Sequence, residues 1–275
     1  MRIVILILLA LVAFAANSVL VRAALAQGQI GPAAFGAIRL LSGVAMLAIV
    51  LAVQGRLRGV MTQANVISAT ALLIYVTGFS FAYLWLDTGT GALILFGGVQ
   101  ITMFAGALLA GERPGLSRWA GAGLGLLGLA VLFGPKAGAP DFGGAMLMAG
   151  AAMGWGVYTL RGRSSTAPTQ ATAANFMLAT PVAVMLWLLM PDTTPAAPQG
   201  IALAVTSGAI ASGIGYALWY AVLPALKSTQ AAILQLAVPV IALAGGVLLL
   251  GEPFTWLFVL AATLVMAGVV VALKR

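Results

Sequence analysis

The side chains that could carry out chemistry are scarce in this sequence. It contains no histidine, no cysteine and only five carboxylates among its 275 residues. These are Asp87, Glu112, Asp141, Asp192 and Glu252, and each stands between apolar stretches. An activated nucleophile, a metal centre or a pair of carboxylates for acid–base work needs residues that are missing here or too far apart. The sequence therefore predicts no enzyme, no metal site and no cofactor.

Polar side chains inside long apolar stretches are the next candidates, because they are costly in lipid and usually face a bundle interior or water. Gln100 and Gln235 are of this kind, and each amide offers a ligand both donors and an acceptor. Because Pro239 lacks an N–H, it also frees a backbone carbonyl one turn earlier, beside Gln235. Asn17 is a lesser candidate. The alternative is a hydrogen bond between two helices, and the sequence leaves both interpretations open.

Aromatic residues gather in two further apolar stretches. In the first of them the rings recur at every fourth position, which places them on one face of a helix. Two facing stripes would form stacking walls for a flat apolar side chain, or a surface for an organic cation. The alternative is the belt of aromatic residues that anchors helices at a membrane surface. The candidates are Tyr75, Phe79 and Tyr83 in one stretch, Tyr216, Trp219 and Tyr220 in another, and Trp155 in a third.

Arg39 is a cation inside an apolar stretch, roughly 10 Å beyond Pro32 at ~1.5 Å per residue. Its guanidinium could bind a substrate carboxylate through two parallel hydrogen bonds. It could also extend back to the membrane surface, or bond to the carbonyls of a neighbouring helix. Of these interpretations, the structural ones are slightly favoured.

The composition indicates which elements hold these residues in place. Hydrophobic residues make up 63% of the chain and charged residues 7%, against ~45–50% and ~25% in soluble domains. We therefore predict an all-α integral membrane protein with ten transmembrane helices, each of about 20 residues. The net charge of +8 comes from scattered basic residues, which argues against nucleic acid as a partner. The predicted spans are 3–22, 32–53, 65–86, 89–110, 116–134, 143–161, 170–190, 199–222, 229–250 and 254–273.

The chain also contains an internal repeat. The pattern Gly106-x-Leu-Leu-x-Gly-Glu112 recurs as Gly246-x-Leu-Leu-x-Gly-Glu252. Since five spans per half is an odd number, the second half must enter the membrane upside down. We therefore expect two inverted five-helix repeats, residues 1–134 and 143–275. Inverted repeats allow secondary transporters to build a binding site that opens alternately to each side.

Basic residues predict the orientation. With both termini in the cytoplasm, Arg22 and Lys136 are the only basic residues on the opposite side, and Arg39 lies inside the second span. The other basic residues then lie in the cytoplasm, as the positive-inside rule requires. The first span also has features of a secretory signal, but its apolar run is longer than the ~7–15 residues of such signals. We expect it to stay as a membrane helix.

Ten short-looped helices, the Gly-Glu that closes the fourth and ninth spans, and Pro239 within the ninth resemble the EamA-type members of the drug/metabolite transporter superfamily. Within that family the chain most resembles the bacterial exporters of aromatic amino acids. The resemblance implies a bacterial inner-membrane protein that moves small organic solutes outward. It also implies a central cavity that excludes the fifth and tenth spans. The small residues of those two spans suit close packing or a dimer seam, so we expect a monomer or a weak homodimer.

We expect an exporter of amino acids, aromatic or otherwise apolar, or of similar small metabolites, working by alternating access. The amides of Gln100 and Gln235 would hydrogen-bond both ends of a zwitterion. Because no predicted span holds an acidic residue or a histidine, a facilitator driven by the solute gradient fits better than a proton antiporter. The alternatives are a multidrug or organic-cation exporter and, from other classes, a channel or an intramembrane enzyme.

Overall fold

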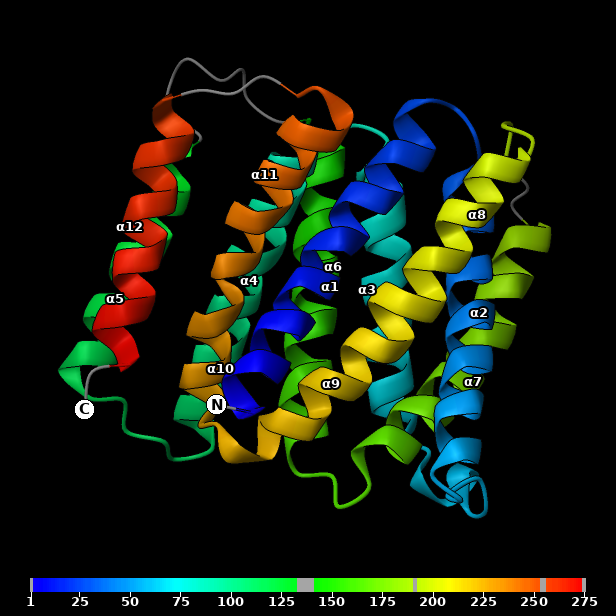
Figure 1. Cartoon of the computed structure of the whole chain (residues 1–275), viewed down its shortest axis with the longest axis horizontal. Helices are drawn as coiled ribbons and strands as arrows, with labels where there is room; N and C mark the ends of the chain where they lie inside the picture. The colour runs from blue at the N-terminus through cyan, green and yellow to red at the C-terminus, as the bar shows by residue number, and fades with distance from the viewer. Residues whose placement is uncertain (1, 133–140, 190–191, 253–255, 274–275) are drawn as a thin grey trace.

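The computed structural model describes residues 2–132, 141–189, 192–252 and 256–273, and these form a single bundle of helices (Figure 1). No strand occurs in these segments. The first half contains α1 (Arg2–Ala26), α2 (Pro32–Val53), η1 (Val60–Gln63), α3 (Val66–Ala82), α4 (Thr88–Leu109) and α5 (Leu116–Leu132). The second half contains α6 (Phe142–Arg163), α7 (Pro168–Leu189), α8 (Pro198–Thr206), η2 (Ser207–Ile214), α9 (Gly215–Val222), η3 (Leu223–Ala225), α10 (Ser228–Gln235), α11 (Ala237–Leu250) and α12 (Trp256–Leu273).

Several of these elements continue one another. The apolar rod 198–225 joins α8 to η3, and the rod 228–250 joins α10 to α11. With these joined, the described chain crosses the bundle ten times, which confirms the predicted ten-helix membrane fold. Six of the described rods reach the length and apolarity that a membrane crossing requires, and α3 is a shorter apolar helix. Exposed apolar side chains such as Leu109 and Leu188 cover the flanks, as expected of a surface that faces lipid.

Successive rods run in opposite directions. α1 begins and α12 ends at the bottom of Figure 1, termed the lower end, whereas α2 and α4 begin at the upper end. The lower end carries basic residues, among them Arg56, Arg161 and Arg163. The carboxylates Asp87 and Glu252 lie at the upper end.

The predicted boundaries are close to the observed ones, with differences at four places. α1 continues to Ala26 and α6 to Arg163. α3 stops at Ala82, because the next four residues tighten into turns closed by bonds such as that from the Trp85 N–H to the Ala82 carbonyl. The ninth crossing is broken after Gln235, one turn before Pro239.

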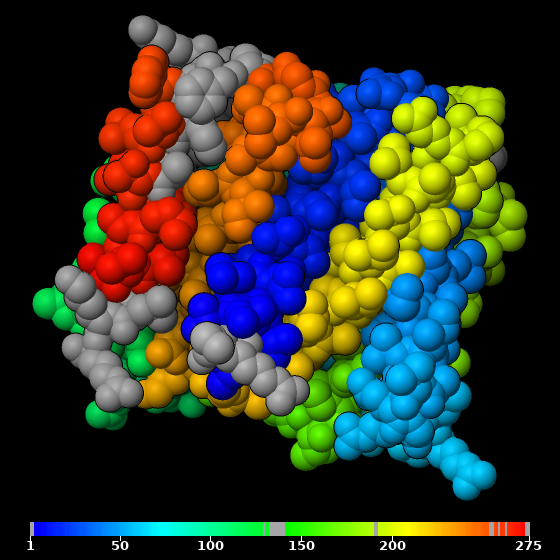
Figure 2. Space-filling view, viewed as in Figure 1, coloured from blue at the N-terminus to red at the C-terminus, as the bar shows by residue number. Residues whose placement is uncertain are grey.

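The two halves interleave at the middle of the bundle. α6 packs against α3 and α4 of the first half, while α1 packs against α9 and α11 of the second. Figure 2 shows α1 (blue) lying between α11 (orange) and the α8–α9 rod (yellow). The site described below is therefore assembled from both halves.

α5 and α12 form a separate pair at one margin of the bundle (Figure 1). Their backbones touch: a Cβ on Gly268 would lie 2.6 Å from the carbonyl oxygen of Gly121. A Cβ on Gly128 would lie 2.8 Å from the Ala261 carbonyl oxygen. The small residues of these helices are thus engaged within one chain, so close packing accounts for them without a dimer seam.

Candidate functional site

Arg39 lies at the centre of the site and is fully buried. Its Nε donates to Ser212 Oγ at 2.9 Å, and its Nη2 donates to the hydroxyls of Tyr75 (2.9 Å) and Tyr216 (3.1 Å). The guanidinium carbon also lies 5.1 Å from the ring centroids of both Tyr75 and Phe79, within cation–π range. The interpretation that Arg39 extends to the membrane surface or bonds to helix carbonyls is therefore wrong, because side chains of three elements hold it in the interior.

One of the two residues of the eighth crossing that bond to Arg39, Ser212, comes from an unusual element. η2 is π-helical, a conformation that is rare and frequently found at functional sites. It brings Ser212 to Arg39 and lets Ser207 donate to the Asn17 Oδ1 at 2.7 Å. Gly208 is required here, since a Cβ would overlap the backbone carbonyl of Arg39. The backbones of η2 and α2 are therefore in direct contact at the site.

The two aromatic stripes meet at Trp155. Its ring centroid lies 4.7 Å from that of Tyr216, 5.0 Å from that of Tyr75 and 5.2 Å from that of Phe14. Phe14 also contacts Trp219, at 5.6 Å. The sequence predicted two facing walls but omitted Phe14 from the candidates. The sequence contained a pattern that could have identified Phe14, because Phe14 and Trp155 each precede an arginine by eight residues in the first helix of their half.

The two glutamines have different surroundings. Gln235 Oε1 accepts the indole N–H of Trp155 at 2.7 Å, and its Nε2 lies 3.3 Å from the Ala231 carbonyl and 3.4 Å from the Met103 sulfur. Gln100 is equally buried, but neither polar atom of its amide has a hydrogen-bond partner in the described chain. Gln235 therefore fixes Trp155 in place, whereas the Gln100 amide is available.

The outer members of the aromatic stripes belong to the two ends and not to the centre. Tyr83 packs on Phe79 at 4.9 Å and donates from its hydroxyl to the Thr88 carbonyl at 3.3 Å, near the upper end. Tyr220 packs on Tyr158 at 5.6 Å, towards the lower end. Tyr158 was not among the sequence candidates, although it lies one turn after Trp155 on the same helix.

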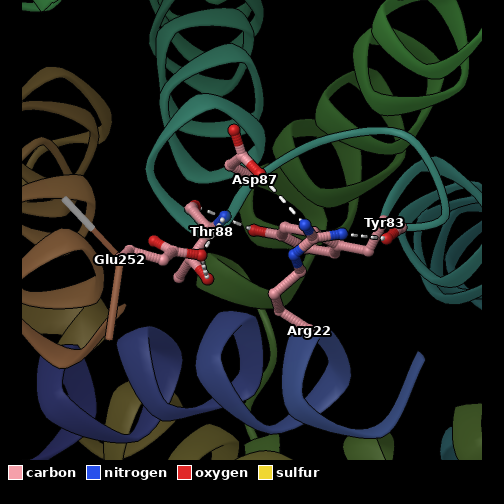
Figure 3. A network of polar contacts seen from close by, with 5 residues as sticks. All are labelled: Arg22, Tyr83, Asp87, Thr88 and Glu252. Carbon is pink, nitrogen blue, oxygen red and sulfur yellow. Dashed lines mark hydrogen bonds and ion pairs between the residues drawn. The ribbon is translucent and has the colours of Figure 1, made fainter. Parts of the chain in front are cut away.

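The upper end is held together by the group of residues in Figure 3, termed the upper clasp. The Arg22 Nη2 pairs with Asp87 at 3.0 Å, and its Nη1 donates to the Tyr83 carbonyl at 3.3 Å. Glu252 Oε1 accepts both the Oγ1–H (2.7 Å) and the backbone N–H (3.2 Å) of Thr88. The upper clasp thus ties the α3–α4 turn to the ends of α1 and α11.

The lower end has a matching group, termed the lower clasp. Arg163 pairs with Glu112 at 3.2 Å and donates to the Leu226 carbonyl at 2.8 Å, while Glu112 accepts the Ser228 N–H at 3.1 Å. Partial burial acts to raise the pKa of Glu112, but hydrogen bonds from Ser228 and the charge of Arg163 outweigh it and lower that pKa below its ordinary value. The lower clasp ties the α9–α10 turn to the ends of α4 and α6.

The two clasps explain why Gly-Glu occurs twice. The carboxylate after α4 accepts from the first residue of α10, and the carboxylate after α11 accepts from the first residue of α4. A carboxylate at a helix N-terminus satisfies orphan N–H groups and complements the helix dipole. The sequence showed the repetition of the motif but not this role.

A polar cavity of about 240 Å³ lies at the lower end between α3, α6, α7 and α9. This volume is below the ~300–1,000 Å³ of pockets for drug-sized ligands, and so suits a small solute. Tyr158 lies between the cavity and the centre, with its ring centroid 5.9 Å from that of Trp155. Other lining residues include Asn65, Arg161, Thr172, Asn175 and Tyr220.

Comparisons with known proteins give the family context of this architecture. A sequence profile of the EamA-like transporter family matches residues 1–134 and 142–274. The chain is 46% identical to an uncharacterized protein of Pseudomonas aeruginosa, over 92% of this chain and 88% of that protein. It is 29% identical to an uncharacterized transporter of Bacillus subtilis, over 90% and 86% of the two chains. A solved structure shares the fold with a TM-score of 0.77 and 21% identity, covering 96% of this chain and 97% of the other.

Proposed function

Because the chain belongs to the EamA-like transporter family, we propose that this membrane transporter exports small organic solutes with a flat apolar side chain, aromatic amino acids above all. The observation that carries the proposal is the buried centre in which Trp155 joins Tyr75 to Tyr216. Such rings stack on an aromatic side chain in offset or edge-on geometry. The Gln100 amide and the polar atoms around Arg39 offer partners for the charged end of the solute.

A multidrug or organic-cation exporter is disfavoured by charge. Cation–π contacts with the rings at the centre would hold such a solute. However, Arg39 already makes this buried region positive, and a second positive charge would repel it in a low dielectric. A solute with a negatively charged group is the better match.

Alternating access follows from treating residues 1–134 and 143–275 as inverted repeats. The clasps support this interpretation, since the same kind of carboxylate-to-helix contact occurs at opposite ends of the bundle. We infer that the upper clasp closes the upper end in this conformation and that solute enters through the polar cavity of the lower end, which Tyr158 separates from the centre. Opening the upper clasp while the lower cavity closes would release the solute on the other side.

We place the lower end on the cytoplasmic side of a bacterial inner membrane, because basic residues concentrate there. All five carboxylates stand outside the helices, so the interior lacks the titratable acid that proton antiport requires. The carrier then works as a facilitator driven by the solute gradient. The site is complete within one chain, which is consistent with a monomer as well as a weak homodimer.

The experiment is a transport assay with purified protein in liposomes and a panel of radiolabelled amino acids and quaternary amines. The expected result is saturable flux of phenylalanine, tyrosine and tryptophan, which Gln235→Ala and Tyr75→Ala reduce without loss of folded protein. Gln230→Ala is the matched control, because that amide caps the exposed N–H of Lys227 at the lower surface. Normal phenylalanine flux in both site variants, or flux of quaternary amines alone, would contradict the proposal.

A further inference from the structure

Arg39 is a buried positive charge without a carboxylate partner. The structure describes all five carboxylates of the chain, and each is engaged elsewhere. Asp87 pairs with Arg22, Asp141 accepts the Gly144 N–H, Asp192 accepts the Ala33 and Ala34 N–H groups, Glu112 pairs with Arg163, and Glu252 accepts from Thr88. A charge at membrane depth is costly and normally pairs with another group. None of the five side-chain carboxylates supplies a counter-charge to Arg39.

Several buried donors of the central helices have no hydrogen-bond partner in the described chain. They are the Arg39 Nη1, the Asn17 Nδ2 and the Trp219 Nε1, the last on a ring that packs against Phe14. The orientation of the Asn17 amide follows from its neighbours, because its Oδ1 accepts from Ser207 at 2.7 Å and lies 3.5 Å from the Ser212 hydroxyl. Ser212 is also the acceptor for Arg39 Nε. A ligand that offers acceptors would satisfy these donors.

We propose that this centre is a carboxylate-binding site, and that the substrates are monocarboxylates with a flat apolar side chain. The inference rests on the proposed function and narrows it. The carboxylate would neutralise Arg39 and accept from its free Nη1, while the side chain stacks among Tyr75, Phe79 and Trp155. Binding at this site does not require the α-amino group. Aromatic acids without an amino group are therefore ligands too, beside the amino acids.

A purely structural arginine is the rival explanation. Arg39 does tie α2 to α3 and to the eighth crossing through Tyr75, Tyr216 and Ser212. A neutral amide could supply similar bonds without burying a charge. The cation–π contacts with Tyr75 and Phe79 do use the charge, but the structural role leaves the free Nη1 unexplained, whereas a bound carboxylate accounts for it.

The test compares three ligands that share a 2-phenylethyl group and differ in the polar group at its end, on the purified wild-type protein. The quenching of tryptophan fluorescence reports binding, since Trp155 and Trp219 border the centre. 3-Phenylpropionate should bind about ten- to hundred-fold more tightly than 3-phenylpropanamide, as expected for a hydrogen bond between charged groups. 2-Phenylethylamine, which has the ring but a positive charge, should bind weakest.

Variants then test whether Arg39 causes the preference for the acid over the amide. Arg39→Gln should bind the acid and the amide with similar affinity, and Arg39→Lys should retain part of the preference because it keeps the charge but loses the planar fork. Arg58→Gln, which removes an exposed cation of the loop between α2 and α3, is the control and should behave like the wild type. If Arg39→Gln does not fold, the wild-type ligand series and Arg39→Lys still decide.

Equal binding of acid and amide to the wild type overturns the inference, and so does failure of all three ligands to bind. An Arg39→Gln variant that keeps the wild-type preference overturns it as well. Transport of labelled phenylalanine, measured separately, distinguishes the two proposals. Phenylalanine flux without a carboxylate preference defeats only the inference, whereas carboxylate binding without flux of any aromatic solute defeats only the proposed function.

Discussion

At the scale of single residues, the bond between Trp155 and Gln235 can be tested as a pair. Trp155→Phe keeps a ring in place but leaves the Gln235 Oε1 without its 2.7 Å donor. Leaving a buried acceptor unpaired costs about 1–3 kcal/mol, so thermal unfolding should occur at a lower temperature. The double variant with Gln235→Leu should recover most of that loss, because removing both partners is nearly neutral. If the stability losses of the two single variants simply add in the double variant, the two residues are not coupled.

Several site residues could be predicted from their types and depth in apolar stretches. Gln235, Tyr75 and Tyr216 were expected to face the interior, and they do. The sequence offered carboxylate binding by Arg39 as one interpretation but slightly favoured a structural role, because depth along a helix does not say which face the side chain occupies. Ser212 was also missed, since a serine in a helix commonly bonds to its own backbone, and only the packing of η2 on α2 brings it to Arg39.

At the scale of elements, the upper clasp should control access from the upper end. Glu252→Gln removes the charge that holds the N-terminus of α4, an interaction worth about 0.3–1 kcal/mol at a helix terminus. A cysteine at the buried Ser18, in a chain without native cysteines, should then react faster with an impermeant reagent applied from the upper side. Glu112→Gln, the equivalent change at the lower clasp, should not accelerate this reaction. Equal acceleration by both variants would mean that the clasps do not act as separate gates.

The marginal pair α5–α12 gives a second prediction at this scale. Gly121→Leu should lower the free energy of unfolding by about 1–3 kcal/mol through overpacking. The reason is that a Cβ at this position would lie 2.5 Å from the Gly268 carbonyl oxygen. Gly123→Leu on the same helix is the control, as its Cβ would meet no atom within 4 Å. The flux per folded protein should stay unchanged in both. A selective loss of flux in Gly121→Leu would place this pair in the transport mechanism.

Turn residues allowed most helix boundaries to be predicted, because Pro32, Pro168 and Pro198 each begin a helix. Irregular backbone within the crossings was harder to predict from the sequence. Pro239 indicated the break after Gln235, but no local signal distinguishes the π-helical turns of η2 from an ordinary helix. That segment depends on contacts with α1 and α2, which lie far away in the sequence.

At the scale of the whole molecule, the orientation in the membrane is the first prediction. A cysteine at Thr194, in the upper turn between α7 and α8, should react with an impermeant thiol reagent outside intact cells. One at the exposed Gln54, after α2, should react only after the cells are broken. The reverse pattern would place the basic lower end outside and invert the direction of transport. The equivalent position Ala139 lies outside the described residues.

The most direct test of the account is whether flux passes through a site that alternates between the two sides. Liposomes that contain the protein are loaded with unlabelled phenylalanine, and uptake of radiolabelled phenylalanine from outside is followed over time. A carrier exchanges an internal solute molecule for an external one at its single binding site. Uptake of the label should therefore overshoot equilibrium in loaded liposomes and not in empty ones. Arg58→Gln should show the same overshoot, and Gln235→Ala a smaller one. Uptake that rises linearly with concentration and is indifferent to the internal solute would identify a channel and contradict alternating access.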